Sequence, residues 1–226
     1  MITSFGSFDL IIFDWDGTLF DSVSPIIDLM DDAGLDQPQT EAARHLKQSG
    51  LLPVLEQIIA AEHAVQVVDL KLLLHLEGLH TFRKRSNLYD GIAELLAKLH
   101  ASGQKMAVVA GRPQAEVMAE INQLGISHYF FTVVGSDRGS VKPNPALLQS
   151  ILSLAECVPN RALMVGDSSL DMEMATLARM SMLGVAYLTT THDPYCVERL
   201  RPWQPLAIAG SIDELSQILL GEHQIN

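Results

Sequence analysis

Short apolar runs alternate along most of this chain with amphipathic segments, and this alternation constrains the fold more than any other feature. The runs, typical of buried strands, are 10–13, 106–110, 129–134, 162–165, 182–187 and 206–209. The segments between them with helical periodicity are 92–100, 114–124, 146–154, 170–178 and 212–220. Strands that alternate with helices predict an α/β fold, a Rossmann-like parallel sheet core with helices on both faces.

Some predicted helices carry recognisable start signals. Ser211 with Glu214 has the spacing of a capping box, and Asn144 followed by Pro145 is typical of a cap with proline in the first turn. In a parallel sheet of this kind, the reactive groups gather beyond the carboxyl ends of the strands.

One region interrupts the alternation soon after the first strand. No convincing strand is found there, while helical patterning occurs over 25–33, 41–48, 54–61 and 65–82. The prediction is an α/β catalytic core of residues 1–19 and 87–226, with an all-helical cap of residues 20–86 inserted after the first strand. Turn-forming residues at both borders are expected to act as linkers on which the cap hinges.

Composition excludes several classes of protein. The formal net charge of −12 disfavours nucleic acid and anionic membranes as partners. Although 48% of the residues are hydrophobic, no uninterrupted apolar stretch approaches the roughly 20 residues that span a bilayer. Two cysteines without metal-type spacing indicate neither a disulfide framework nor a zinc site. The N-terminus lacks the basic flank of a signal peptide, so a cytoplasmic protein is expected.

Pairs of carboxylates follow two of the predicted strands. Asp14 and Asp16 come at the end of the first strand, and Asp167 and Asp171 follow the fourth. Each pair alone is compatible with an ordinary polar turn or a helix cap. Together, however, carboxylates at the ends of two buried strands repel one another unless a cation lies between them. A set of oxygen ligands alone suits a hard ion such as Mg²⁺.

A lysine lies between these pairs in the sequence. Lys142 stands in a proline-containing loop just before a predicted helix. A loop lysine is most often a solvated surface charge. Its place after the third strand nevertheless directs it to the same edge of the sheet.

These residues resemble the motifs of the haloacid dehalogenase-like superfamily of phosphotransferases. The motifs are 14–18 (Asp-Trp-Asp-Gly-Thr), Lys142 with Pro143, and 166–171 (Gly-Asp-Ser-Ser-Leu-Asp), in this order and with a helical insert after the first. The position of the insert, the Asp-Ser pair after Phe20 and the Tyr-Asp-Gly at 89–91 resemble the phosphoglycolate phosphatase-like branch.

The resemblance implies a role for each acidic residue. Asp14 would attack phosphorus and form an aspartyl-phosphate. Asp16 would protonate the leaving oxygen and then activate water, a group that a dehalogenase does not need. Mg²⁺ would be held by Asp14, the Asp16 backbone carbonyl and Asp167, with Asp171 supporting the metal or the lysine. Lys142 would balance negative charge on nucleophile and phosphate.

Phosphate binding is implied for Thr18, Ala110, Gly111 and Arg112 together with Lys142. Ala110 departs from the family pattern, because the second strand normally ends there in a Ser or Thr whose hydroxyl donates to the phosphoryl group. Losing such a donor typically lowers the rate about 10²- to 10³-fold. The backbone N–H groups of Gly111 and Arg112, or the Arg112 guanidinium, are candidate replacements. Arg112 is equally well explained as a surface residue.

Substrate contacts are expected from the insert. Arg44, Lys47 and Gln48 resemble the substrate-facing loop of the family, and their basic groups would suit a second anionic group such as a carboxylate. An exposed basic helix end explains the same residues.

The predicted function is a Mg²⁺-dependent phosphatase, a phosphoric monoester hydrolase acting on a small phosphorylated metabolite similar to phosphoglycolate. The expected assembly is a monomer or homodimer. Two alternatives remain open at this point: a pseudo-phosphatase that binds phosphorylated ligands or a partner, suggested by Ala110, and a sugar phosphomutase that shares the nucleophile.

Overall fold

The computed structural model describes residues 8–22, 87–138, 140–187 and 194–221. The chain divides into two compact units, Met1–Leu19 with Leu88–Asn226, and Phe20–Asn87. The helices predicted over 25–33, 41–48, 54–61 and 65–82 lie outside the described residues. Short strands β2 (Phe20–Asp21) and β3 (Asn87–Leu88) form a two-stranded sheet.

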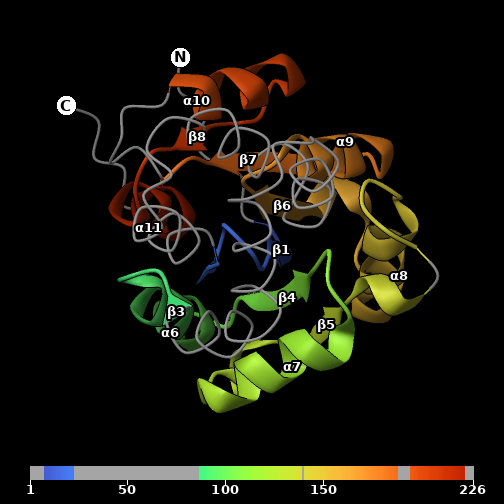
Figure 1. The fold of residues 1–226 in the computed structure, drawn as a ribbon, viewed down its shortest axis with the longest axis vertical. Coiled ribbons are helices and arrows are strands. Elements are labelled where there is room, and N and C mark those ends of the chain that lie inside the picture. The colour runs from blue at the N-terminus through green and yellow to red at the C-terminus, as the bar shows by residue number, and fades with distance from the viewer. Residues whose placement is uncertain (1–7, 23–86, 139, 188–193, 222–226) are drawn as a thin grey trace, which may run out of the picture. The chain divides into compact units, whose positions relative to one another are not determined.

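The larger unit is built on one six-stranded sheet with the strand order β5-β4-β1-β6-β7-β8 (Figure 1). All neighbouring strands are parallel. Their bounds are β1 (Leu10–Asp14), β4 (Lys105–Val109), β5 (Thr132–Val134), β6 (Ala162–Gly166), β7 (Ser181–Val185) and β8 (Ile208–Ala209). The predicted α/β class with a parallel sheet is confirmed.

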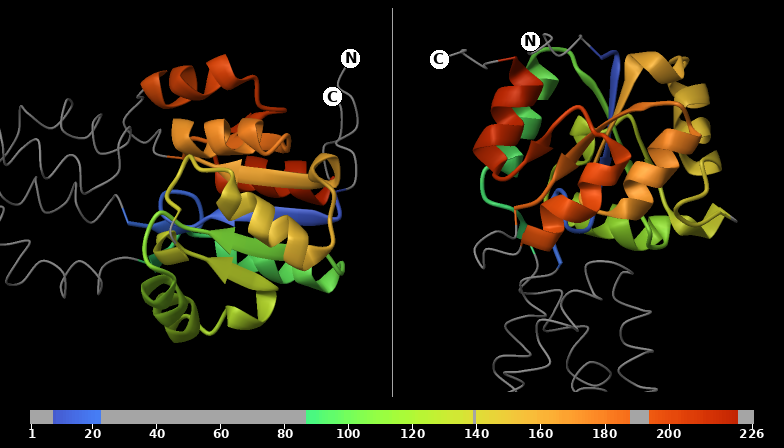
Figure 2. Two further views of the ribbon diagram at one scale, coloured as in Figure 1. Left: turned by 90° about the vertical axis from the view of Figure 1, so that its right-hand side faces the viewer. Right: turned by 90° about the horizontal axis from the view of Figure 1, so that it is seen from above.

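Helices cover the sheet on opposite sides, as Figure 2 shows. On one face lie α6 (Ile92–Ala101) and α11 (Ile212–Leu220), which contact each other. On the other lie α8 (Ala146–Ala155) and α9 (Ser169–Leu177), whose buried side chains pack with those of the central strands into one hydrophobic core. The other α-helices among the described residues are α7 (Gln114–Gln123) and α10 (Pro194–Leu200), the second of which the sequence patterns did not predict. None of the described helices has the length and apolarity that crossing a membrane takes.

Two predicted strands form over only half of their apolar runs. The run at 129–134 forms a strand only from Thr132, because Ser127–Tyr129 is a turn of 3₁₀ helix. The Tyr129 ring packs against those of His100 and His128 there, so its aromatic side chain finds partners without a strand. The run at 206–209 forms a strand only over Ile208–Ala209.

The predicted helix starts are correct in part. Asn144 Oδ1 accepts a hydrogen bond from the Ala146 N–H at 3.0 Å. Ser211 Oγ accepts from the Glu214 N–H at 3.2 Å, as in a capping box. The Glu214 carboxylate, however, accepts from the Gly210 N–H at 2.8 Å, one residue before the expected donor.

The connections of the sheet single out the carboxyl end of β1. From β1 the chain proceeds to β4 and β5 on one side, and then returns to β6, β7 and β8 on the other. Neighbouring strands with diverging connections leave a crevice beyond their carboxyl ends, where ligands bind in open parallel sheets. The candidate site is built at this point.

Candidate active site

Asp14 ends β1, a strand in which every residue is buried, and Lys142 reaches it from the loop after β5. Lys142 Nζ donates to Asp14 Oδ1 at 2.5 Å and to Asp171 Oδ1 at 2.7 Å. The lysine side chain is only 8% exposed. It is therefore one half of a buried ion pair and not a solvated surface charge.

Asp171 is fully buried in the first turn of α9 and is fixed by the cap of that helix. Its Oδ2 accepts from the Ser168 hydroxyl at 2.6 Å and from the Ser168 N–H at 3.2 Å, while Ser168 Oγ accepts from the Asp171 N–H. A Cβ on Gly166 would lie 2.6 Å from Asp171 Cβ, so only glycine fits beside it. The capping box thus directs the other oxygen, Oδ1, to Lys142.

Asp167 leaves the end of β6 and meets the turn after β1. Thr18 Oγ1 donates to Asp167 Oδ1 at 3.3 Å. Gly17 has φ +81°, and a Cβ there would lie 2.6 Å from Asp167 Oδ2, so the turn needs glycine for its backbone and for space. Arg199 of α10 donates to the Asp167 backbone carbonyl at 3.1 Å. Thr18, predicted to bind phosphate, contacts a predicted metal ligand here.

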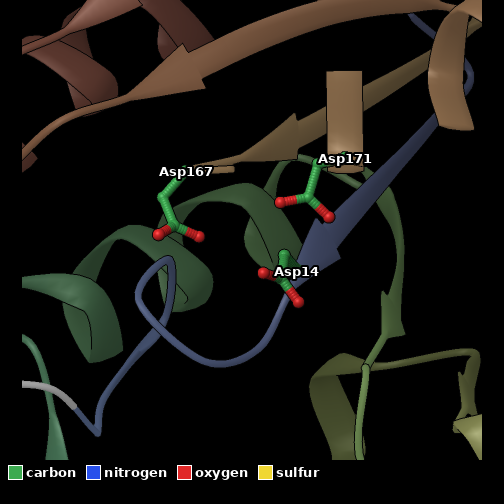
Figure 3. A group of neighbouring side chains, drawn as sticks. All are labelled: Asp14, Asp167 and Asp171. Carbon is green, nitrogen blue, oxygen red and sulfur yellow. The ribbon is translucent and has the colours of Figure 1, made fainter. Parts of the chain in front are cut away.

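We call Asp14, Lys142, Asp167 and Asp171 the lysine cluster. Figure 3 shows its three carboxylates converging from β1, from the end of β6 and from α9, and one oxygen of each lies within 4.8 Å of the others. Within the described residues, this is the group of acidic, cysteine or histidine side chains that could hold a metal ion. Oxygen ligands at this spacing fit a small hard cation.

The pKa values of the lysine cluster also favour a bound cation. Burial raises the pKa of Asp14 well above its ordinary value, and the negative charge of Asp171 raises it further, although Lys142 opposes both. Burial and Asp171 also raise the pKa of Asp167 to about 6. Burial disfavours the charge of Lys142, yet Asp14 and Asp171 raise its pKa above the ordinary value. Three carboxylates thus share the positive charge of one lysine, and the remaining negative charge is what a bound divalent cation would offset.

A second group, which we call the arginine cluster, consists of Asp16, Arg112, Glu120 and Trp15. Arg112 Nε donates to Asp16 Oδ2 at 2.8 Å. Its two terminal nitrogens donate to Glu120 of α7, at 3.0 Å to Oε1 and 2.6 Å to Oε2. The Trp15 indole N–H donates to the same Oε2 at 2.8 Å. Burial disfavours the charge of Arg112, but Glu120 and Asp16 raise its pKa above the ordinary value.

The remaining predicted phosphate ligands lie at the end of β4. The Ala110 side chain is fully buried, and its N–H donates to the Val134 carbonyl at 2.9 Å. Gly111 is exposed. Helix α7 begins at Gln114, whose N–H donates to Asp137 Oδ1 at 3.1 Å. The Arg112 guanidinium, considered above as a replacement for the Ser or Thr hydroxyl that Ala110 lacks, is bonded to Asp16 and Glu120.

Three predicted substrate residues fall outside the described part of the chain: Arg44, Lys47 and Gln48. Conversely, the sequence analysis missed Glu120 and Arg199. Glu116 and Glu120 follow Arg112 at helical spacing, a signal that could have revealed an acidic helix face beside the arginine. No comparable pattern marks Arg199, because its contact depends on how α10 packs.

Comparison with known proteins identifies the class. Residues 11–185 match the haloacid dehalogenase-like hydrolase family. A phosphoglycolate phosphatase of Photobacterium profundum is 31% identical over 196 residues, covering 81% of this chain and 85% of the relative. A phosphoglycolate phosphatase of Vibrio parahaemolyticus is 29% identical over 223 residues, covering 93% and 95%. The chain therefore belongs to the haloacid dehalogenase-like hydrolases, and the predicted enzyme class, a phosphatase of this family, is confirmed.

Solved structures agree on the fold. A haloacid dehalogenase-like hydrolase from Streptococcus pneumoniae has a TM-score of 0.70 at 21% identity, covering 96% of this chain and 99% of that one. A haloacid dehalogenase-like protein from Agrobacterium tumefaciens has a TM-score of 0.72 at 18% identity, covering 96% and 100%. At these identities the likeness concerns the fold alone.

Proposed function

We propose that this protein is a Mg²⁺-dependent phosphatase that hydrolyses a small phosphomonoester through a phosphorylated Asp14. The observation that carries the proposal is the lysine cluster, in which a carboxylate at the end of the central strand shares a buried ammonium with Asp171. The relatives named phosphoglycolate phosphatase support a short, doubly anionic phosphate ester as substrate.

The nucleophile is held ready by its neighbours. Asp14 Oδ1 accepts from Lys142 Nζ and from the Trp15 N–H at 2.6 Å, which orients Oδ2 as the attacking atom. The buried ammonium offsets negative charge as the carboxylate approaches a phosphate. Asp171, anchored by Ser168, keeps the lysine in place.

The metal site would be formed by Asp14 and Asp167, with the Asp16 backbone carbonyl as a further ligand. Bound Mg²⁺ would supply neutralisation of charge on the phosphoryl oxygens. Thr18 and Gly17 set the position of Asp167 on its side of the site. Both carboxylate oxygens of Asp171 already accept hydrogen bonds, one from Lys142 and the other from Ser168, and we assign Asp171 a supporting role.

Asp16 would protonate the leaving alkoxide when the phosphoryl group moves to Asp14. It would then take a proton from the water that attacks the phosphorylated Asp14, which releases inorganic phosphate and restores the carboxylate. The inserted residues 20–86 would act as a cap that excludes bulk water, and Arg44, Lys47 and Gln48 would contact the second anionic group of the substrate.

The test is phosphate release from a panel of metabolite phosphates that includes 2-phosphoglycolate, with and without Mg²⁺. We expect release that depends on Mg²⁺ and that Asp14→Asn abolishes. Isomer interconversion without free phosphate would contradict the proposal and indicate a phosphomutase.

One observation favours a second candidate, a protein that binds phosphorylated ligands without turnover. Ala110 offers no hydroxyl at the end of β4, and its N–H is used within the sheet. Tight binding of a metabolite phosphate without release of phosphate in the same panel would support this candidate. We favour the phosphatase because the lysine cluster is intact.

A further inference from the structure

We propose that Glu120 is a positioning residue for catalysis: it holds the Arg112 guanidinium, and Arg112 in turn holds the Asp16 carboxylate beside the nucleophile. The inference rests on the function proposed above, since it concerns how Asp16 acts in that reaction. It assigns a role to a residue of α7 that carries no motif.

The geometry between Glu120 and Arg112 leaves the guanidinium little freedom. Both terminal nitrogens donate to the two oxygens of one carboxylate, at 3.0 and 2.6 Å. A guanidinium is planar, so two parallel hydrogen bonds on one edge fix the direction of the third donor. That donor is Nε, which bonds to Asp16 Oδ2 at 2.8 Å. The orientation of Asp16 therefore depends on Glu120 through one rigid group.

Glu120 is itself fixed by Trp15, which directly follows the proposed nucleophile Asp14 in the chain. The indole N–H of Trp15, a fully buried residue, donates to Glu120 Oε2 at 2.8 Å. The Glu120 side chain is only 14% exposed. Trp15 stands between Asp14 and Asp16 in the chain, so Glu120 is bonded to the same short segment that carries both aspartates. An ordinary surface pair such as Glu94–Lys98, with side chains 72% and 51% exposed, has no such constraint.

A fixed Asp16 matters because proton transfer requires hydrogen-bond distance to the leaving oxygen and later to water. Arg112 engages Oδ2, and Oδ1 makes no hydrogen bond with the described residues, so Oδ1 is the oxygen for the proton transfers. Misplacement by about 1 Å can cost as much as about 100-fold in rate. Loosening Arg112 should thus impair proton transfer while substrate binding and the lysine cluster remain intact.

The experiment compares two substrates in Glu120→Gln. An alkyl phosphate, 2-phosphoglycolate, needs its leaving oxygen protonated, whereas p-nitrophenyl phosphate has a leaving group stable as an anion. We expect kcat/KM to fall about tenfold for the alkyl ester and less than about threefold for the aryl ester. A role limited to tethering α7 would lower both equally or neither, and either result would overturn the proposal.

Two controls sharpen the result. Glu116→Gln removes the same charge from the same helix, at 3.7 Å from Arg112 and 42% exposed, and should change both constants by less than about twofold. In an Asp16→Asn background, Glu120→Gln should cause no further loss for the alkyl ester, because the residue through which it acts is already disabled. Additive losses would contradict the proposal.

Stability and metal binding are measured in parallel. Glu120→Gln should keep the rise in Tm that Mg²⁺ produces, and losing that rise would contradict a role confined to Asp16. Absence of phosphate release by the unmodified chain would refute the proposed function and this inference together. Unmodified turnover with an unchanged ratio between the esters would refute only the role of Glu120.

Discussion

The lysine cluster contains Asp14 and the arginine cluster contains Asp16, two residues further along the chain, and the two clusters use their cations differently. In the first, an ammonium with an 8% exposed side chain contacts carboxylates that are 7% and 0% exposed. In the second, a guanidinium that is 29% exposed joins carboxylates that are 29% and 14% exposed. The lysine lies among buried carboxylates whose charge it offsets, whereas the arginine is partly exposed and bonds two carboxylates at once.

The difference follows from the chemistry of the two side chains. An ammonium is a point charge with rotatable donors, suited to balancing a nucleophile whose charge changes during the reaction. A guanidinium is a planar fork, suited to holding two carboxylates at a fixed angle. Electrostatic losses should therefore dominate on the lysine side and losses of proton transfer on the arginine side.

The largest expected effect is on Asp14. Asp14→Asn keeps the shape of the side chain but removes the oxygen anion that we propose attacks phosphorus, so kcat should fall on the order of 10⁴-fold or more for alkyl and aryl esters alike. Phosphate release is the measurement, and an unchanged Tm within a few degrees shows that the fold is retained. If the variant kept its activity on the aryl ester, Asp14 would not be the nucleophile.

The next effect concerns Lys142. Lys142→Met leaves Asp14 and Asp171 facing each other without a counterion, and removing one partner of a buried pair costs about 3 to 5 kcal/mol. We expect a clear fall in the free energy of unfolding at pH 7, measured in urea, and about 10²-fold or greater loss of kcat. The stability loss should shrink toward pH 4, because burial raises the pKa of Asp14 and its protonation removes the repulsion with Asp171.

The surface pair supplies the control for Lys142. Lys98→Met breaks the exposed contact with Glu94 and should change the free energy of unfolding by no more than about 0.5 kcal/mol. Equal losses in the two variants would show that Lys142 is as well solvated as Lys98. The lysine cluster would then not differ from the arginine cluster in the way its burial predicts.

The third effect is a gain in stability at Asp167. Its pKa of about 6 lies above the ordinary 3.8, so the folded chain binds this proton more tightly than the unfolded chain. Stability contributed by this group therefore falls as pH rises from about 4 to about 6. Asp167→Asn should raise the Tm of the metal-free protein by a few degrees at pH 7, but not at pH 4.

Mg²⁺ separates this explanation from a general charge effect. The cation should raise the Tm of the unmodified chain and leave that of Asp167→Asn nearly unchanged. Asp9 serves as the control, because its exposed contact with Arg161 lowers its pKa, the opposite direction. Asp9→Asn should thus not stabilise the protein at pH 7. A stabilised Asp9→Asn would mean that the overall charge of −12, and not the lysine cluster, sets the result.

The approach of Asp14, Asp167 and Lys142 was predictable because parallel strands bring their carboxyl ends to one edge, whatever the details of packing. Asp171 was predictable as a helix-start residue three positions after its capping serine. Contacts that depend on the direction of a long side chain were not. Arg112 was considered as a phosphate ligand or a surface residue, and nothing local indicates that its guanidinium turns toward Asp16.

Strand ends and contacts between separate elements could not be predicted for the same reason. Tyr129 and Phe130 extend the apolar run of β5, but Tyr129 lies in a 3₁₀ turn and its ring packs edge-on against that of His100. Glu120 lies eight residues beyond Arg112, and its partner Trp15 comes from the turn after β1, far away in the sequence. A one-dimensional pattern records periodicity, whereas these contacts arise between elements.

The smallest expected effect tests whether the arginine cluster already replaces the missing hydroxyl at Ala110. All three guanidinium nitrogens of Arg112 are bonded to Asp16 or Glu120, so none is committed to a phosphate. Ala110→Ser should therefore raise kcat by about three- to tenfold, well short of the 10²- to 10³-fold that a donor in a preorganised site contributes.

The fully buried position of Ala110 will limit the gain, because an added atom in a packed site costs about 1 to 3 kcal/mol. Serine is chosen over threonine for that reason, and the Tm of each variant reports the packing cost separately from kcat. An unchanged kcat with an unchanged Tm would mean that another donor serves the phosphoryl group. Arg112 would be the first candidate for that donor, and the double variant Ala110→Ser with Glu120→Gln would test it.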